Sequence, residues 1–531
     1  MATTLCCITA AIPCLTETSS HSSDSTQRRS KKVIEVLMLK NPLLVVALII
    51  TASIAIWGIV DTQGLANFAA KLVGAQFSSR AWFIMLTVSF LLIISIWLAI
   101  SRYGSIKLGK DDDEPEFATL SWLAMLFSAG MGVGLLYWGT AEPLSHYLLV
   151  SDYENSNKAA SISLFLTNFH WGFHAWAIYA MTGLVIAYFS FRLGCPSLIS
   201  SPIIKVFGKT RLPRTIGWLI DLMAIVAIAI GLGGSVAMGV FQVKEGIDVL
   251  FQLKDTGMGL TMGVFVVLCL TYILPLTVEL GKGMVLLSNA AMIVAGTLLI
   301  YLLLVGPTSF LMGGIVQGLG EYLGSFLVHG FTTFTFMDDR IGGWFQSWTL
   351  TYMLWWLAWA PFVGVFIARI SKGRTIREFV CCVVLVPTAF SILWFGVFGG
   401  IGFYDIQSGE LPILDVVRDN ISGVTFYVLE QFPLSSLTIA GVVIAAFLFL
   451  VTSVVSAAFV LAMFSTGGDL NPSTKVKLSW GFVLGALGLA MILSGSIDAV
   501  KSIIALGALP FVFIILLLVV CFLKALKTER I

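Results

Sequence analysis

Residues 348–361 read WTLTYMLWWLAWAP, a stretch with four tryptophans in twelve positions and no charged side chain. The rest of the chain has the same character: of 531 residues, 58% are hydrophobic and 11% are charged, and the mean hydropathy is +0.96. A soluble domain carries about 25% charged residues. The sequence therefore predicts an all-α membrane protein, and its net charge of +2 gives no indication of a nucleic-acid partner.

The tryptophans of this region divide by depth. Trp344 and Trp348 stand near the start of the apolar run, where Trp is typical of the membrane–water interface. Trp355, Trp356 and Trp359 lie about 10–16 Å further along a helix that rises 1.5 Å per residue, which is too deep for the interface. We expect these three inside the protein, either as core packing or, in the interpretation that we favour, as a ligand-binding box.

Twelve apolar runs are long enough to cross a bilayer, which needs about 20 residues in a helix. With the N-terminus in the cytoplasm, 23 of the 31 Lys and Arg residues fall on the cytoplasmic side and 8 on the other. This bias predicts two cytoplasmic termini and a multi-pass protein of the plasma membrane, the inner membrane in a bacterium. The predicted spans are 41–60, 81–101, 119–140, 160–191, 214–241, 259–279, 285–306, 344–370, 378–403, 437–465, 477–496 and 500–524.

The chain divides into three predicted parts. Residues 1–30 are Ser/Thr-rich and polar and are expected to form a disordered cytoplasmic tail. Residues 31–525 are expected to form a transmembrane domain, and residues 526–531 a short cytoplasmic tail. The connection 307–343 has mixed character and is expected to include an amphipathic helix on the outer surface.

Spans 3–7 and 8–12 are two sets of five, and each set is expected to open with an interrupted helix. Span 3 carries GMGVG at 130–134, and span 8 carries Pro361 and Gly364. Interrupted spans in corresponding positions indicate the binding site of a transporter. Unwinding at 130–134 would present a helix N-terminus to a substrate carboxylate and free carbonyls to Na⁺. Close helix packing through the glycines is the alternative.

A second aromatic set occurs in HWGFHAWAIY at 170–179. Trp171, Trp176 and Tyr179 lie roughly on one helix face and are candidates for the same box. A quaternary ammonium has no N–H to donate, so its diffuse charge is best held by aromatic faces. For His170 and His174 we favour hydrogen-bonded structural roles over metal binding or a proton relay, because the span offers no third ligand.

Three stretches together resemble the betaine/carnitine/choline transporter family: AGMGVGLLYWGTAEP, HWGFHAWAIYA and WTLTYMLWWLAWAPFVGVFIARISKGRTIREF. The similarity runs from about residue 33 to 525, with Met353 where the family usually has another Trp. It implies 12 transmembrane helices, with five-helix inverted repeats (spans 3–7 and 8–12) of the LeuT-like type after two extra helices, often as a homotrimer. By motif position it implies a substrate site of Trp171, Trp176, Tyr179, Trp355, Trp356, Trp359, Gly130, Met131 and Gly132.

The sequence leaves open whether transport is coupled to Na⁺, coupled to H⁺ or driven by exchange, and no other cofactor is expected. In sodium-driven relatives one ion lies between the break in span 3 and hydroxyls of span 10, which implies a candidate sodium site of Ser128, Met131, Phe449, Thr452 and Ser453. Ile228 and Leu232 align with a second sodium site of such relatives and cannot coordinate an ion. The candidates for a titrating group within the spans are Glu142, Asp221, Glu279, His170 and His174, and for Glu142 we favour a structural or gating role.

The sequence thus predicts a secondary active transporter that imports a quaternary ammonium solute (glycine betaine, choline or carnitine) by alternating access. A proton-coupled carrier or an exchanger of a related onium compound is the alternative within transport. A substrate-sensing membrane receptor is the alternative of a different class. An enzyme is not expected, because the spans lack clustered carboxylates or His/Cys ligands.

Overall fold

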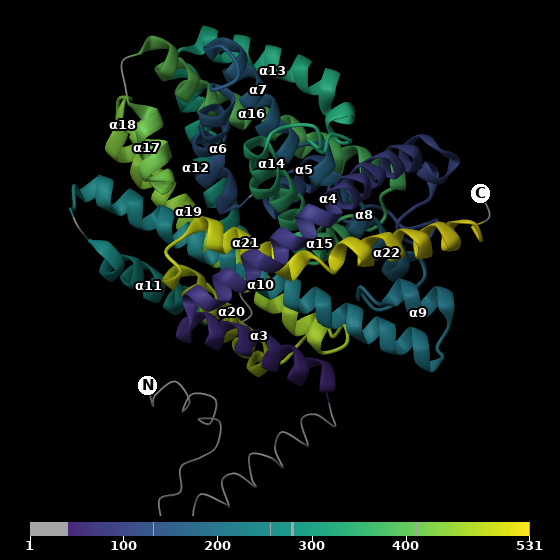
Figure 1. The fold of residues 1–531 in the computed structure, drawn as a ribbon. Helices are drawn as coiled ribbons and strands as arrows, with labels where there is room; N and C mark the ends of the chain where they lie inside the picture. Colours follow the sequence, from purple (N-terminus) through teal and green to yellow (C-terminus); the bar gives the residue numbers. More distant parts are fainter. Residues whose placement is uncertain (1–40, 131, 255, 278–280, 410–411, 530–531) are drawn as a thin grey trace, which may run out of the picture.

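The computed structural model describes residues 41–130, 132–254, 256–277, 281–409 and 412–529, which fold into helices (Figure 1). The predicted tail over 1–30 lies outside these ranges, as do residues 530–531. The first half contains α3 Pro42–Val60, α4 Thr62–Ile100, η1 Arg102–Ser105, α5 Thr119–Gly130, α6 Val133–Val150, α7 Ser156–Trp171, α8 Phe173–Ala187, η2 Tyr188–Arg192, α9 Ser201–Phe207, α10 Arg211–Phe251, α11 Gly257–Thr277 and α12 Gly281–Val305.

After α12 comes the connecting helix α13, and the second set of helices follows it. The bounds are α13 Thr308–His329, α14 Asp339–Phe345, η3 Gln346–Leu350, α15 Thr351–Ile370, α16 Ile376–Ser408, α17 Ile413–Asp419, η4 Ile421–Gly423, α18 Val424–Glu430, α19 Ser435–Ser465, α20 Thr474–Leu493, α21 Ile497–Ala508 and α22 Phe511–Leu526.

Twelve helical segments in the described part of the chain are long and apolar enough to cross a membrane, which confirms the predicted number of spans. The set differs from the predicted one in a single member. Span 3 is divided into α5 and α6, and neither half is among the twelve segments. Helix α13 is among them in its place. The most apolar window of α13 is only 17% buried in the protein, and this helix packs against α7 and α16 at the edge of the bundle (Figure 1). Its position on an outer membrane surface stays a prediction.

The two central segments that carry the aromatic stretches are less apolar than the peripheral helix α3. The segment 156–192 has a hydropathy of 1.3 in a window that is 94% buried, and the segment 339–370 has 1.6 in one that is 78% buried. The peripheral helix α3 reaches 2.7 with 33% buried. Lipid accepts few polar groups, whereas a helix surrounded by other helices can carry Trp, Tyr, His and Glu. The chemistry-bearing stretches are therefore in the middle of the protein.

The interruption expected at Pro361 is wrong. Helix α15 runs through Pro361 without a break, and the irregular turn is the π-helical η3, which ends eleven residues earlier. Proline removes one N–H, but this residue is buried among neighbouring helices, which is where a missing helical bond is tolerated. Gly364 serves close packing instead, because a Cβ there would lie 2.8 Å from Thr182 of α8.

Two groups of helices meet at the centre. One group contains α6, α7, α8, α15 and α16, which contact one another, and α8 lies directly against α15. The other contains α3, α10, α12, α19 and α20, with α10 against α19 and α20. The groups touch where α10 contacts α15 and α6, and α21 contacts both α15 and α10. The site lies where these groups face each other.

Candidate functional site

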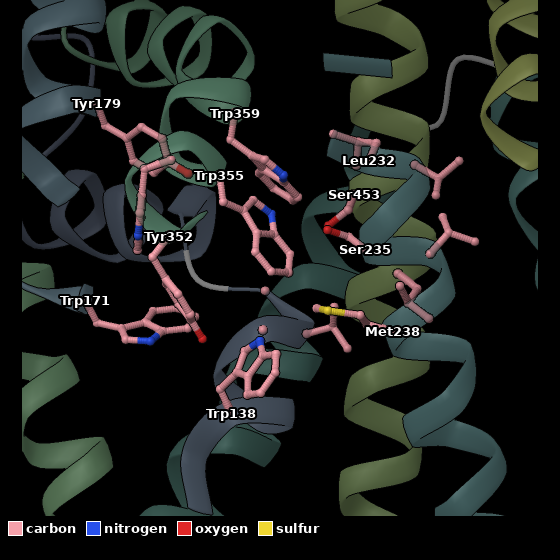
Figure 2. Close-up of a pocket in the computed structure, with 17 residues that line it drawn as sticks. Trp138, Trp171, Tyr179, Leu232, Ser235, Met238, Tyr352, Trp355, Trp359 and Ser453 are labelled. Atoms are coloured by element: carbon pink, nitrogen blue, oxygen red, sulfur yellow. The ribbon is translucent and has the colours of Figure 1, made fainter. Parts of the chain in front are cut away.

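A cavity with about 670 Å³ of empty space lies between the two groups of helices (Figure 2). Four helices of the first group supply one wall and α10 and α19 supply the other. The lining residues are Gly132, Val133, Gly134, Trp138, Trp171, Tyr179, Leu232, Ser235, Val236, Met238, Tyr352, Trp355, Trp356, Trp359, Leu450, Ser453 and Val454.

Seven aromatic rings make the first wall, and Trp356 is at the centre of their packing. Its ring centroid lies 5.5 Å from that of Trp171 with the planes at 86°, and 4.9 Å from that of Tyr179. Tyr352 lies 5.9 Å from Trp171 and 6.0 Å from Trp355. Rings that meet at steep angles present faces in several directions, and such faces attract a cation that enters between them.

The second wall is mostly aliphatic. Leu232 and Met238 of α10 lie opposite the rings, and the hydroxyls of Ser235 and Ser453 add two polar groups (Figure 2). Leu450 of α19 lines the same wall. The Ser235 hydroxyl donates to the Gly231 carbonyl in its own helix at 3.3 Å. The cavity therefore pairs an aromatic wall with an apolar one that carries few polar groups, as small-molecule sites do.

Most of the predicted box residues come together around this cavity. Trp171, Tyr179, Trp355, Trp356, Trp359 and Gly132 line it. Gly130 is the last residue of α5, and Met131 lies outside the described residues.

Trp176 is placed differently from the prediction. It is fully buried behind the wall, with its ring 5.5 Å from that of Tyr179 and 5.9 Å from that of Trp356. The predicted common face assumed one continuous helix, but Gly172 separates α7 from α8, so helical spacing does not carry across that point. Trp176 supports the rings that line the cavity.

The N-terminus of α6 opens into the cavity. Its N-cap is Gly132, which makes no side-chain capping bond, and Gly132, Val133 and Gly134 all line the cavity. Backbone N–H groups at a helix N-terminus carry partial positive charge and suit an anion. A Cβ at Gly134 would lie 3.1 Å from the Trp171 ring, so glycine here lets the indole approach the start of α6.

Glu142 is fully buried directly behind the aromatic wall and accepts four hydrogen bonds. Its Oε1 accepts from His170 Nδ1 at 2.8 Å and from His146 Nε2 at 3.3 Å. Its Oε2 accepts from Trp171 Nε1 at 2.8 Å and from the Tyr352 hydroxyl. Each of these side chains except the histidines lines the cavity, so one carboxylate fixes two rings of the box by their polar edges.

This network could not be predicted from the sequence, because most of its members are far apart in the chain. His170 does have both ring nitrogens in hydrogen bonds, the second to Thr349 at 2.9 Å. The buried His174 differs from the expectation, since neither of its ring nitrogens has a hydrogen-bond partner among the described residues. Asp221 is buried and accepts hydrogen bonds from the backbone N–H and the hydroxyl of Ser200. Glu279 lies outside the described residues.

Glu142, His146 and His170 offer three ligand atoms within 4.8 Å of one another, an arrangement that the sequence did not indicate. Trp344 Nε1 donates to His146 Nδ1 at 3.1 Å, which leaves the Nε2 proton of that ring for Glu142. The ligand atoms are thus already engaged with one another. Hydrogen bonding of a buried anion accounts for the cluster without a metal ion.

The interfacial positions predicted for Trp344 and Trp348 are wrong. Trp344 is 8% exposed and bonded to His146, while Trp348 stacks on Tyr352 with ring centroids 6.0 Å apart. Both belong to the interior packing around the Glu142 network. Their place near the start of a span suggested an interface, but the segment 339–370 is covered by other helices over most of its length.

The structure describes only some of the candidate sodium residues. Ser453 lines the cavity, and its hydroxyl lies 3.8 Å from the Cβ position of Gly132 at the α6 N-terminus. The Thr452 hydroxyl donates to the Phe449 carbonyl of its own helix at 3.1 Å. The side chain of Ser128 and the whole of Met131 lie outside what the structure describes.

A family model for BCCT, the betaine/carnitine/choline family transporter, matches residues 42–531. The chain belongs to this family. The glycine betaine transporter OpuD of Bacillus subtilis is 38% identical over 91% of this chain and 94% of its own. A probable glycine betaine transporter of Desulfitobacterium hafniense is 35% identical over 92% of this chain and 98% of its own. An ectoine/hydroxyectoine transporter of Virgibacillus pantothenticus is 32% identical over 92% of this chain and 97% of its own. The family confirms the predicted multi-pass membrane transporter, which is a carrier and not an enzyme.

Proposed function

We propose that this family member imports a quaternary ammonium solute of the glycine betaine, choline or carnitine type by alternating access. The observation that carries the proposal is the box of seven aromatic rings between the two helix groups. The trimethylammonium head would lie against Trp171, Tyr179, Trp356 and Trp359, and a carboxylate or hydroxyl would lie at the α6 N-terminus.

The chemistry of the wall favours an onium over an ordinary amine. A primary ammonium needs hydrogen-bond acceptors, whereas a quaternary one needs only polarisable faces, each worth about 0.5–2 kcal/mol. The carboxylate of Glu142 lies behind this wall, and its oxygens are occupied by four donors. The box is thus suited to a cation that cannot donate hydrogen bonds.

The position of the cavity supports alternating access. It lies where the two groups of helices face each other, so relative movement of the groups would expose it to either side. We place both termini in the cytoplasm of a plasma membrane, the bacterial inner membrane, on the Lys and Arg bias of the loops. A homotrimer in membrane lipid remains a prediction.

The test is uptake of labelled glycine betaine, choline and carnitine by the purified full-length chain in proteoliposomes. We expect saturable uptake that any of the three unlabelled solutes reduces. The variant with Trp356 and Trp359 both changed to Ala should lose this uptake. If it inserts normally and takes up as much solute as the unmodified chain, the proposal is contradicted.

Sodium coupling is the first candidate for the driving force. Ser453 near the α6 N-terminus supports it, because hydroxyl and carbonyl oxygens are the ligands that hard cations prefer. Changing Thr452 and Ser453 together to Ala should then reduce uptake driven by a sodium gradient. An unaltered sodium dependence in this variant would remove the site.

Proton coupling is the second candidate, and the Glu142–His146–His170 cluster favours it. Three titratable groups in direct contact, fully buried at membrane depth, are a typical feature of proton pathways. A pH gradient imposed without sodium distinguishes the two. Uptake that responds to the pH gradient alone supports the proton, and uptake that responds to sodium alone excludes it.

A further inference from the structure

Lys501 is a cation buried inside the protein. Its side chain, on α21, is 6% exposed, and its ammonium lies 3.8 Å from the ring centroid of Trp348 and 5.0 Å from that of Trp138. Asp498, 87% exposed, places an oxygen 3.8 Å away. A lysine near the end of a span ordinarily extends toward interfacial water. An ammonium held instead against two indoles within a span is expensive, and such groups are typical of functional sites.

The ring of Trp138 connects this lysine to the cavity. Trp138 lines the cavity, and the ammonium of Lys501 lies over the same indole. In Figure 2, Trp138 lies at the other end of the cavity from Tyr179 and Trp359. It also stands one helical turn after Gly134, at the α6 N-terminus. Two sources of positive potential, the lysine and the helix end, therefore lie at one end of the cavity.

We propose that Lys501 is a specificity-determining residue, which makes the cavity prefer a quaternary ammonium zwitterion to a quaternary ammonium cation without a carboxylate. The zwitterion would place its onium in the ring box and its carboxylate toward Trp138 and the start of α6. This inference rests on the proposed function and narrows its substrate class from any onium compound to the zwitterionic ones.

The sign of the effect does not depend on the other charges nearby. Asp498 lies 3.8 Å from the Lys501 ammonium and Glu142 acts on it from further away, and both carboxylates remain when the lysine is replaced. A zwitterion and a cation carry the same onium, so its repulsion from Lys501 cancels when their affinities are compared. The attraction between the ammonium and the carboxylate is what remains, and it favours the zwitterion.

The expected size follows from the position of the ring. The ammonium lies 5.0 Å from the Trp138 centroid. A carboxylate in contact with the cavity side of the ring would be roughly 9 Å from the ammonium, which at an effective dielectric constant of about 20 corresponds to a preference on the order of tenfold.

The experiment measures binding of labelled glycine betaine to the purified full-length transporter, with unlabelled choline as competitor. In Lys501→Met we expect the ratio of the choline Kd to the glycine betaine Kd to fall about tenfold. Lys501→Arg keeps the charge and should keep the ratio. Lys244→Met is the matched control, because that lysine is 17% exposed and its charge is offset by Glu245 and Asp248.

An unchanged ratio in Lys501→Met, with the two affinities moving together, would overturn the proposal and leave the lysine a packing role. Should Lys501→Met not be recovered folded, Lys501→Gln answers the same question with a polar side chain. Failure of the proposed function is distinguishable: the unmodified transporter would then bind neither solute, whereas failure of this inference alone leaves its binding of glycine betaine intact.

Discussion

Replacing Glu142 with glutamine or with alanine distinguishes what its hydrogen-bond acceptors contribute from what its negative charge contributes. Glutamine retains one acceptor oxygen and gains an amide donor. His170 is able to accept at Nδ1 when its proton is on Nε2, whereas the indole N–H of Trp171 can only donate. We therefore expect the glutamine amide group to donate to His170 and its oxygen to remain with Trp171 and Tyr352. Both rings then keep their positions in the cavity wall. His146 loses its acceptor in this variant, because its Nδ1 accepts from Trp344 and its Nε2 carries the proton.

Alanine removes all four acceptor contacts. The donors of Trp171 and Tyr352 are then buried without a partner, at about 1–3 kcal/mol each, so the free energy of unfolding should fall by about 2–6 kcal/mol. The two rings also lose the bonds that orient their faces. At about 0.5–2 kcal/mol per ring for a bound onium, substrate affinity should fall roughly fivefold to several-hundredfold. Glutamine should change the affinity by only about threefold, since both rings stay in place.

The assay is equilibrium binding of glycine betaine to each purified variant, with thermal unfolding measured on the same samples. Glu245→Gln is the control, because Glu245 lies on α10 and bonds to Lys244 and Asn420. Unchanged affinity in Glu142→Ala would refute the positioning role. An equal loss in Glu142→Gln and Glu142→Ala would show that the negative charge, and not the pair of acceptors, is what the cavity requires.

Three further predictions address the wall, its packing and the end of the chain. Trp356→Leu should weaken glycine betaine binding about tenfold, whereas Trp82→Leu, whose ring is 60% exposed on α4, should leave it unchanged. Gly231→Ala would place a Cβ 3.2 Å from a cavity indole, so affinity should fall although the protein inserts. The hydrogen bond from Arg192 lowers the pKa of Glu529 below 4.5. The ionised Glu529 therefore contributes to the free energy of unfolding fully above pH 4.5, and this contribution is lost as the pH falls through the lowered pKa. In Glu529→Gln this part of the pH dependence of unfolding should be absent.

The aromatic wall could be predicted from the sequence because ring spacing and depth are local properties. Trp355, Trp356 and Trp359 lie within one stretch, and a helix of known rise fixes how far they are from its start. Trp176 was assigned to the wrong side because helical spacing was carried through Gly172, where α7 ends. Pro361 was assigned too large an effect, because a buried proline loses one hydrogen bond without breaking the helix around it.

The polar layer behind the wall could not be predicted in the same way. Glu142 and Tyr352 are 210 residues apart in sequence, and no spacing rule connects them. Lys501 stands near the start of the last apolar run, where charge is usually explained by membrane topology. In both cases the position along a span was known, but which neighbouring helix it faces depends on the packing of the whole bundle. That packing is a long-range property that one sequence does not display.

The choice of tryptophan and tyrosine over phenylalanine follows from this two-layer arrangement. A phenylalanine offers an onium the same kind of face, but it has no polar edge that a second layer could hold. Trp171 and Tyr352 turn their faces to the cavity and their N–H and O–H groups to Glu142. Trp138 turns one indole to both the cavity and Lys501. A box made of such rings is held in position from behind by charged groups, so that the same residues that attract the substrate also transmit the charge of the interior to it.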